Sequence, residues 1–289
     1  MARARSAKAD PEIRLYLDTS GKEHEHRAVT AAGYLARAAQ WAGFGAAWRA
    51  VLADSGSPEF HATDFFSGRR AFAHLDPKSE HHRALALRFA GACYKHLPNG
   101  FAYTIDVPAY RTQMTEVMRR VKTPTARLLP STLAVSAVCN RIAQRGLPVG
   151  GPKATMLLEA GDGTGEALAW LRHLARIGEP WTAAFLAFDA VPKETIGTQA
   201  ADLLAYESWR EASLVLESPN RTWTDVERDT FKVLATGPTM LPPAKGEPRV
   251  DMQYASAEHF PEWERGFAQF LDEHARYRRS TPGLPRDQP

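Results

Sequence analysis

The sequence has few cysteines, no long apolar run and little net charge. Its 289 residues include two cysteines, Cys93 and Cys139, which excludes a disulfide scaffold and a multi-cysteine zinc cluster. No apolar stretch approaches the roughly 20 residues of a membrane-spanning helix, and segment 1–11 lacks the apolar run of a secretory signal. We therefore expect a cytoplasmic protein without membrane contact. The net charge of +3 is too small to indicate a polyanionic partner by itself.

The apolar pattern predicts strands and helices that alternate along the chain. Alternating or continuous apolar residues predict five strands, at residues 13–18, 27–36, 100–107, 154–159 and 181–188. Apolar residues at helical spacing predict the main helices, at residues 38–53, 80–96, 109–121, 129–145, 166–177 and 198–216. This order favours an α/β fold whose mixed sheet is antiparallel at its start and parallel later.

Changes in composition divide the chain into one main domain and its additions. We expect residues 12–217 to form the domain, with a helical insertion at about 108–150. Segment 1–11 is expected to be a disordered basic tail, and segment 279–289, rich in proline, a second loose tail. The stretch between the domain and that second tail, 218–278, is predicted to be a helical addition with helices near 223–235 and 258–277.

Three carboxylates stand where a protein core normally excludes charge. Asp18 ends the first predicted strand, Glu159 ends the apolar strand, and Asp202 is the only charged residue in the segment 196–206. Charged side chains are rarely buried without a partner. Simpler explanations stay open: Asp18 suits a turn, Glu159 a loop edge, and Asp202 a salt bridge to a nearby arginine or lysine.

The predicted sheet can bring these three groups together. If the first strand neighbours the strand at 154–159, Asp18 and Glu159 lie side by side beneath Asp202. Clustered carboxylates repel one another unless they share protons or bind cations. Because Mg²⁺ and Mn²⁺ prefer oxygen ligands, the pattern predicts a divalent-metal site suited to hydrolysis of a phosphodiester.

Five short segments carry a further pattern. They are LYLDTSG at 15–21, GYLA at 33–36, FHATDFF at 60–66, LLEAGD at 157–162 and TQAADLLAY at 198–206. In this order they resemble the bacterial and phage family catalogued as domain of unknown function 3800, over about residues 13–212. The resemblance implies a ribonuclease-H-like fold, a mixed sheet flanked by helices, and the activity of a metal-dependent nuclease.

The resemblance also implies roles for individual residues. Asp18 matches the first acidic residue of the family, Glu159 the acidic end of a later strand, and Gln199 and Asp202 the terminal pair. On this basis Asp18, Glu159 and Asp202 hold Mg²⁺ or Mn²⁺. The family usually has Asp-Glu-Ser-Gly, whereas this chain has Thr19 at the second position, so one family carboxylate is missing.

A softer family motif contains histidine and a further carboxylate. His61 and Asp64 match it, three residues apart. The resemblance makes Asp64 a fourth acidic ligand and lets His61 or Gln199 orient water or substrate. With Thr19 in place of a carboxylate, more of the metal binding falls to Asp64 or Asp162.

Basic residues gather within the predicted insertion. They are Arg111, Arg119, Arg120, Lys122 and Arg127, against a single acidic residue, Glu116. A solvated helix face is the ordinary explanation for such a cluster, but beside a nuclease site it would bind a phosphate backbone. The expected partner is therefore DNA or RNA. The alternative function is a binding module for nucleic acid or protein that keeps this fold without activity.

Overall fold

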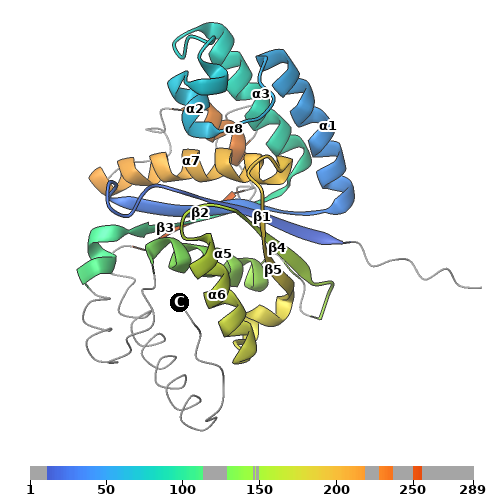
Figure 1. The fold of residues 1–289 in the computed structure, drawn as a ribbon, viewed down its shortest axis with the longest axis vertical. Helices are drawn as coiled ribbons and strands as arrows, with labels where there is room; N and C mark the ends of the chain where they lie inside the picture. Colours follow the sequence, from blue (N-terminus) through green and yellow to red (C-terminus); the bar gives the residue numbers. More distant parts are fainter. Residues whose placement is uncertain are drawn as a thin grey trace, which may run out of the picture.

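The computed structural model describes residues 12–112, 129–145, 147, 150–218, 228–236 and 250–255. Within these ranges six strands form one mixed sheet in the order β5-β4-β1-β2-β3-β6 (Figure 1). The strands are β1 (Ile13–Ser20), β2 (Ala28–Arg37), β3 (Asn99–Asp106), β4 (Ala154–Glu159), β5 (Phe185–Val191) and β6 (Val250–Ala255). β2 is antiparallel to β1 and β3, whereas β4 is parallel to β1 and β5. The predicted α/β fold with a mixed sheet is confirmed.

Helices cover both faces of the sheet. They are α1 (Ala38–Ser55), α2 (Ala62–Ser67), α3 (Glu80–His96), α5 (Pro130–Arg145), α6 (Thr164–Arg176), α7 (Ile196–Glu217) and α8 (Asp229–Thr236), with 3₁₀ turns η1 (Arg70–Phe72) and η2 (Pro180–Ala184). α7 lies along one face, with α1, α2, α3 and α8 beyond it, while α5 and α6 cover the opposite face (Figure 1). None of these described helices is long and apolar enough to cross a membrane.

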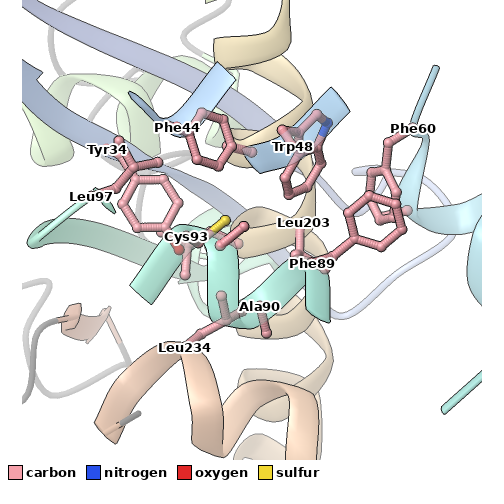
Figure 2. Close-up of a cluster of buried hydrophobic side chains, with 14 of the residues drawn as sticks. Tyr34, Phe44, Trp48, Phe60, Phe89, Ala90, Cys93, Leu97, Leu203 and Leu234 are labelled. Carbon is pink, nitrogen blue, oxygen red and sulfur yellow. The ribbon is translucent and has the colours of Figure 1, made fainter. Parts of the chain in front are cut away.

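The alternation of side chains along β1 separates two apolar cores. Leu15 and Leu17 belong to the core under α5 and α6, whereas Tyr16 belongs to the core under α7. In the second core, aromatic rings from α1 and α3 pack with Leu203 of α7; Figure 2 shows Phe44, Trp48 and Phe89 together with Cys93. Each fully buried large side chain stabilises the fold by roughly 1.5–3 kcal/mol, so the sheet is held firmly on both sides.

A close contact fixes where α7 begins over the sheet. Gly197, in the first turn of α7, lies directly against the ring of Tyr16 in β1. A Cβ atom at position 197 would come within 2.4 Å of Tyr16 Cγ, a separation that ordinary contacts never reach. Because Gly197 has no side chain, α7 can pack closely against β1 at this point. The contact residue in β1 is Tyr16, two residues before Asp18.

Three sequence predictions differ from the structure. The strand predicted at 181–188 begins later, at Phe185, because Pro180–Ala184 form the 3₁₀ turn η2, in which the Thr182 N–H donates to the Glu179 carbonyl. The segment predicted as an insertion contains α5, whose Val135 and Val138 are part of the core beneath the sheet. The addition predicted as helical contains α8 but also β6, which pairs in parallel with β3. The predicted tails and the helix at 258–277 lie outside the described residues.

We expect Gly197→Ala to lower the free energy of unfolding by about 1–3 kcal/mol, the usual effect of overpacking a tight contact. The matched control is Gly91→Ala in α3, where a Cβ atom would meet nothing within 4 Å. That change should stabilise the protein by roughly 0.5–1 kcal/mol, because alanine favours a helix interior. Urea denaturation of both variants measures the difference. Equal effects would contradict the close approach of α7 to β1.

Candidate functional site

Asp18 and Glu159 lie at neighbouring strand ends. β1 and β4 are parallel, with Leu17 opposite Leu158, so the next residue on each strand is one of the two acids. Asp18 is paired across β2 with Ala32, which belongs to the core under α7. Alternation from Leu158, on the opposite face, directs Glu159 to the same side. The predicted adjacency of the two strand ends is confirmed.

Asp202 reaches the same place from α7. It is 6% exposed, and its Oδ2 accepts a hydrogen bond of 2.7 Å from the backbone N–H of Ala62 at the start of α2. Burial raises the pKa of Asp18 well above its ordinary value, and the charges of Asp202 and Glu159 raise it further. The three carboxylates therefore form one electrostatic cluster, as the sequence predicted.

Burial also shifts the other two acids of the cluster. Together with the charge of Asp202, burial raises the pKa of Glu159 to about 7, while Lys193 acts in the opposite direction. The pKa of Asp202 rises to about 6, again because of burial, although His61 and the Ala62 N–H both favour its charged form. Near neutral pH, the site therefore carries negative charge that the fold itself disfavours.

A pocket of about 90 Å³ opens beside this cluster. Its charged lining residues come from three segments of the chain and are Glu59, His61, Asp64, Arg70, Glu159, Lys193 and Asp202. The buried rings of Phe60 and Phe72 form an apolar part of its wall. The volume is sufficient for several water molecules, each of which needs roughly 10–15 Å³.

His61 and Asp64 both line the pocket, as expected from the softer family motif. His61 Nδ1 lies 3.2 Å from Asp64 Oδ2, although the atom has no hydrogen bond of good geometry. The charge of Asp64 also raises the pKa of Asp202, so Asp64 is electrostatically part of the acidic cluster. Asp162, the other carboxylate considered from the sequence, is exposed in the loop after β4.

Thr19 does not face this pocket. It pairs with Ala31, which belongs to the core on the opposite side of the sheet, so its side chain points away from α7. The departure from the family pattern at this position therefore removes no carboxylate from the pocket on the α7 side. Asp64 supplies an additional acidic group there instead.

The buried side chain of Gln199 connects the segments that surround the pocket. Its Oε1 accepts hydrogen bonds from Trp48 Nε1 at 2.9 Å and from the Phe60 N–H at 3.1 Å, and its Nε2 donates to the Glu194 carbonyl at 3.1 Å. These bonds tie α1, the segment before α2 and the loop before α7 to one amide. Gln199 therefore positions the pocket-lining segments, a role that its place in the family motif did not reveal.

The structure describes one of the five predicted nucleic-acid-binding residues. Arg111 is exposed and donates a hydrogen bond to the Glu23 carbonyl in the turn between β1 and β2. Arg119, Arg120, Lys122 and Arg127 lie outside the described residues. The helix that follows them, α5, packs beneath the sheet, on the face opposite α7.

The chemistry of these side chains suits a hard divalent cation. Carboxylate oxygens are the ligands that Mg²⁺ and Mn²⁺ prefer, and a cation would relieve the repulsion that raises the pKa of Asp18. In the part of the chain that the structure describes, no three or more His, Cys, Asp and Glu side chains are arranged to hold a metal ion as they stand.

Comparison with known proteins supplies no relative. No protein-family model, curated protein or solved structure matches the chain. The resemblance to the domain of unknown function 3800 family therefore stays a prediction from the sequence. Function has to be inferred from the geometry and charge of the site.

The raised pKa values predict how stability depends on pH. Glu159 and Asp202 shift upward from ordinary values of 4.5 and 3.8 to about 7 and about 6, so the folded protein binds protons more tightly than the unfolded chain. The contribution of these groups to the free energy of unfolding therefore falls as pH rises from about 4 to 7. We expect a higher Tm at pH 5.5 than at pH 7.5.

Asp202→Asn isolates this contribution, because an asparagine carbonyl can still accept the Ala62 N–H. We expect the variant to have a higher Tm than the unmodified protein at pH 7.5 and a smaller change between the two pH values. Calorimetric scans at both pH values measure the effect. An unchanged pH dependence in Asp202→Asn would show that the charge of Asp202 does not disfavour the folded state.

Proposed function

We propose that this protein is a divalent-metal-dependent nuclease on a ribonuclease-H-like fold, the activity that the family resemblance implies. The observation that carries the proposal is the convergence of Asp18, Glu159 and Asp202 from two neighbouring strand ends and the helix above them. Asp64 adds a fourth carboxylate at the adjoining pocket. Such a concentration of buried negative charge disfavours the fold, which is typical of functional sites.

The topology supports the fold assignment. Three antiparallel strands, β1 to β3, are followed by β4 and β5 parallel to β1, and α5, α6 and α7 connect or follow the later strands. The acids sit where neighbouring parallel strands end, the edge at which α/β sheets ordinarily build their sites. This order agrees with the ribonuclease-H-like arrangement that the resemblance implies.

In this proposal the acidic residues and His61 have different roles. Asp18, Glu159 and Asp202 would hold Mg²⁺ or Mn²⁺, with Asp64 available as a further ligand. When bound, the ion supplies an activated water and stabilises charge on the phosphodiester oxygens. His61 Nδ1 is held beside Asp64, which leaves Nε2 as the ring nitrogen able to orient water or substrate.

We expect the purified protein to cleave labelled DNA or RNA in Mn²⁺ or Mg²⁺ and to stop when the metal is chelated. Asp202→Asn should reduce the rate at least about 100-fold, a typical cost of removing an electrostatic group from an active site. The control Asp162→Asn changes an exposed carboxylate close to Glu159 in sequence and should retain full activity. Gel assays of DNA and RNA substrates measure these rates.

Two results would contradict the proposal. Cleavage that persists in chelator, or that is undiminished in Asp202→Asn, would exclude the carboxylate cluster as the catalytic centre. Salt-sensitive binding of nucleic acid without cleavage in either metal would instead favour the alternative, a binding module that keeps this fold.

A further inference from the structure

Two cationic side chains line the otherwise acidic pocket. Arg70 belongs to η1, and Lys193 to the loop between β5 and α7. Arg70 Nη1 lies 3.5 Å from Asp64 Oδ2, a long ion pair, and the Arg70 side chain is 75% exposed. Lys193 is also exposed, and its charge acts on Glu159. Both groups can therefore turn toward an anion that enters the pocket.

The backbone of Arg70 is held in a strained conformation. Its φ angle is +48°, the only positive value for a residue other than glycine in the described ranges. Such a conformation is unfavourable for a residue with a side chain and is common at sites where a side chain serves a ligand. Phe72, two residues later, is 1% exposed and packs against Phe65 with 5.1 Å between ring centroids, so the core anchors the turn that contains Arg70. The fold thus holds Arg70 at the pocket rim at the expense of stability.

The size of the pocket limits what can enter. A cavity of ~150 Å³ holds a benzene molecule, whereas this pocket measures about 90 Å³. A phosphate group with a few waters fits this space, whereas a nucleobase would not fit wholly within it. The lining also offers an anion two positive charges, which an acidic pocket needs if it is to accept a phosphodiester.

We infer that Arg70 and Lys193 bind one phosphate of the nucleic-acid backbone and that this pocket reads no base. This inference rests on the proposed function, because it assigns the substrate group to the same site. Arg70 offers a planar fork that pairs with two phosphate oxygens, whereas Lys193 supplies a single point of charge. The substrate is therefore recognised through its phosphodiester, and cleavage is independent of the base at that position.

Binding of a labelled phosphorothioate oligonucleotide, measured by fluorescence anisotropy in the Asp202→Asn background, tests this inference without cleavage. Adding Arg70→Gln or Lys193→Gln should raise Kd at least about 10-fold, as expected when one charge-assisted hydrogen bond is lost. Each should also lower the slope of log Kd against log salt by about one. The controls Arg69→Gln and Lys153→Gln remove exposed charges that do not line the pocket and should leave Kd within about 2-fold.

Arg70→Gly separates ligand binding from a structural role. Glycine accepts a positive φ without strain, so we expect an unchanged or higher Tm together with the same loss of affinity as Arg70→Gln. A lower Tm with unchanged Kd would show that Arg70 serves the fold alone. Oligonucleotides of dT, dA and dC should bind within about 2-fold of one another, and a 10-fold preference for one base would overturn the inference.

The outcome distinguishes failure of this inference from failure of the proposed function. If Arg70→Gln and Lys193→Gln bind as tightly as their controls while the unmodified protein cleaves with Mn²⁺, the phosphate assignment is wrong and the nuclease proposal stands. If both variants lose affinity but the unmodified protein cleaves nothing in either metal, the phosphate-binding pair stands and the proposed catalysis is wrong.

Discussion

The close packing of α7 against β1 is the constraint on which the site depends. Gly197 lets the first turn of α7 touch Tyr16, and Asp202 follows 5 residues later along the same helix. That approach brings Asp202 into the same electrostatic cluster as Asp18 and Glu159, and Asp202 itself is buried. The apolar cores on both faces of the sheet hold this arrangement in place, although the acids oppose it. A stable scaffold thus carries a locally unfavourable charge distribution.

A second set of contacts joins the remaining pocket residues to this frame. The side chains of Gln199 and Asp202 accept backbone hydrogen bonds from Phe60 and Ala62, so α7 fixes the segment that contains His61. From there α2 and η1 lead to Asp64 and Arg70, which line the same pocket. A single helix, α7, therefore positions a segment that lies more than 100 residues earlier in the sequence. Changes along one face of α7 should affect the whole site together.

Much of the fold and the acidic cluster could be predicted from the sequence. The strands β1 and β4 have clear apolar patterns, and an isolated Asp202 on an apolar helix indicates a special environment. Three features could not be predicted. The start of β5 depends on the turn η2 before it, the sixth strand pairs with β3 only through long-range contacts, and the core position of α5 depends on tertiary packing. The roles of Gln199 and Arg70 were also hidden, because hydrogen bonds between distant segments and a positive φ leave no mark in residue spacing.

We propose that the clustered carboxylates of Asp18, Glu159 and Asp202 bind a divalent cation. Calorimetric titration of the 289-residue protein with Mn²⁺ at pH 7.5 tests this most directly, with Asp18→Asn beside the exposed control Asp162→Asn. We expect saturable Mn²⁺ binding that is lost in Asp18→Asn and retained in Asp162→Asn. Bound Mn²⁺ should also raise the Tm of the unmodified protein. Absence of saturable binding, or equal binding by Asp18→Asn and the unmodified protein, would contradict this proposal.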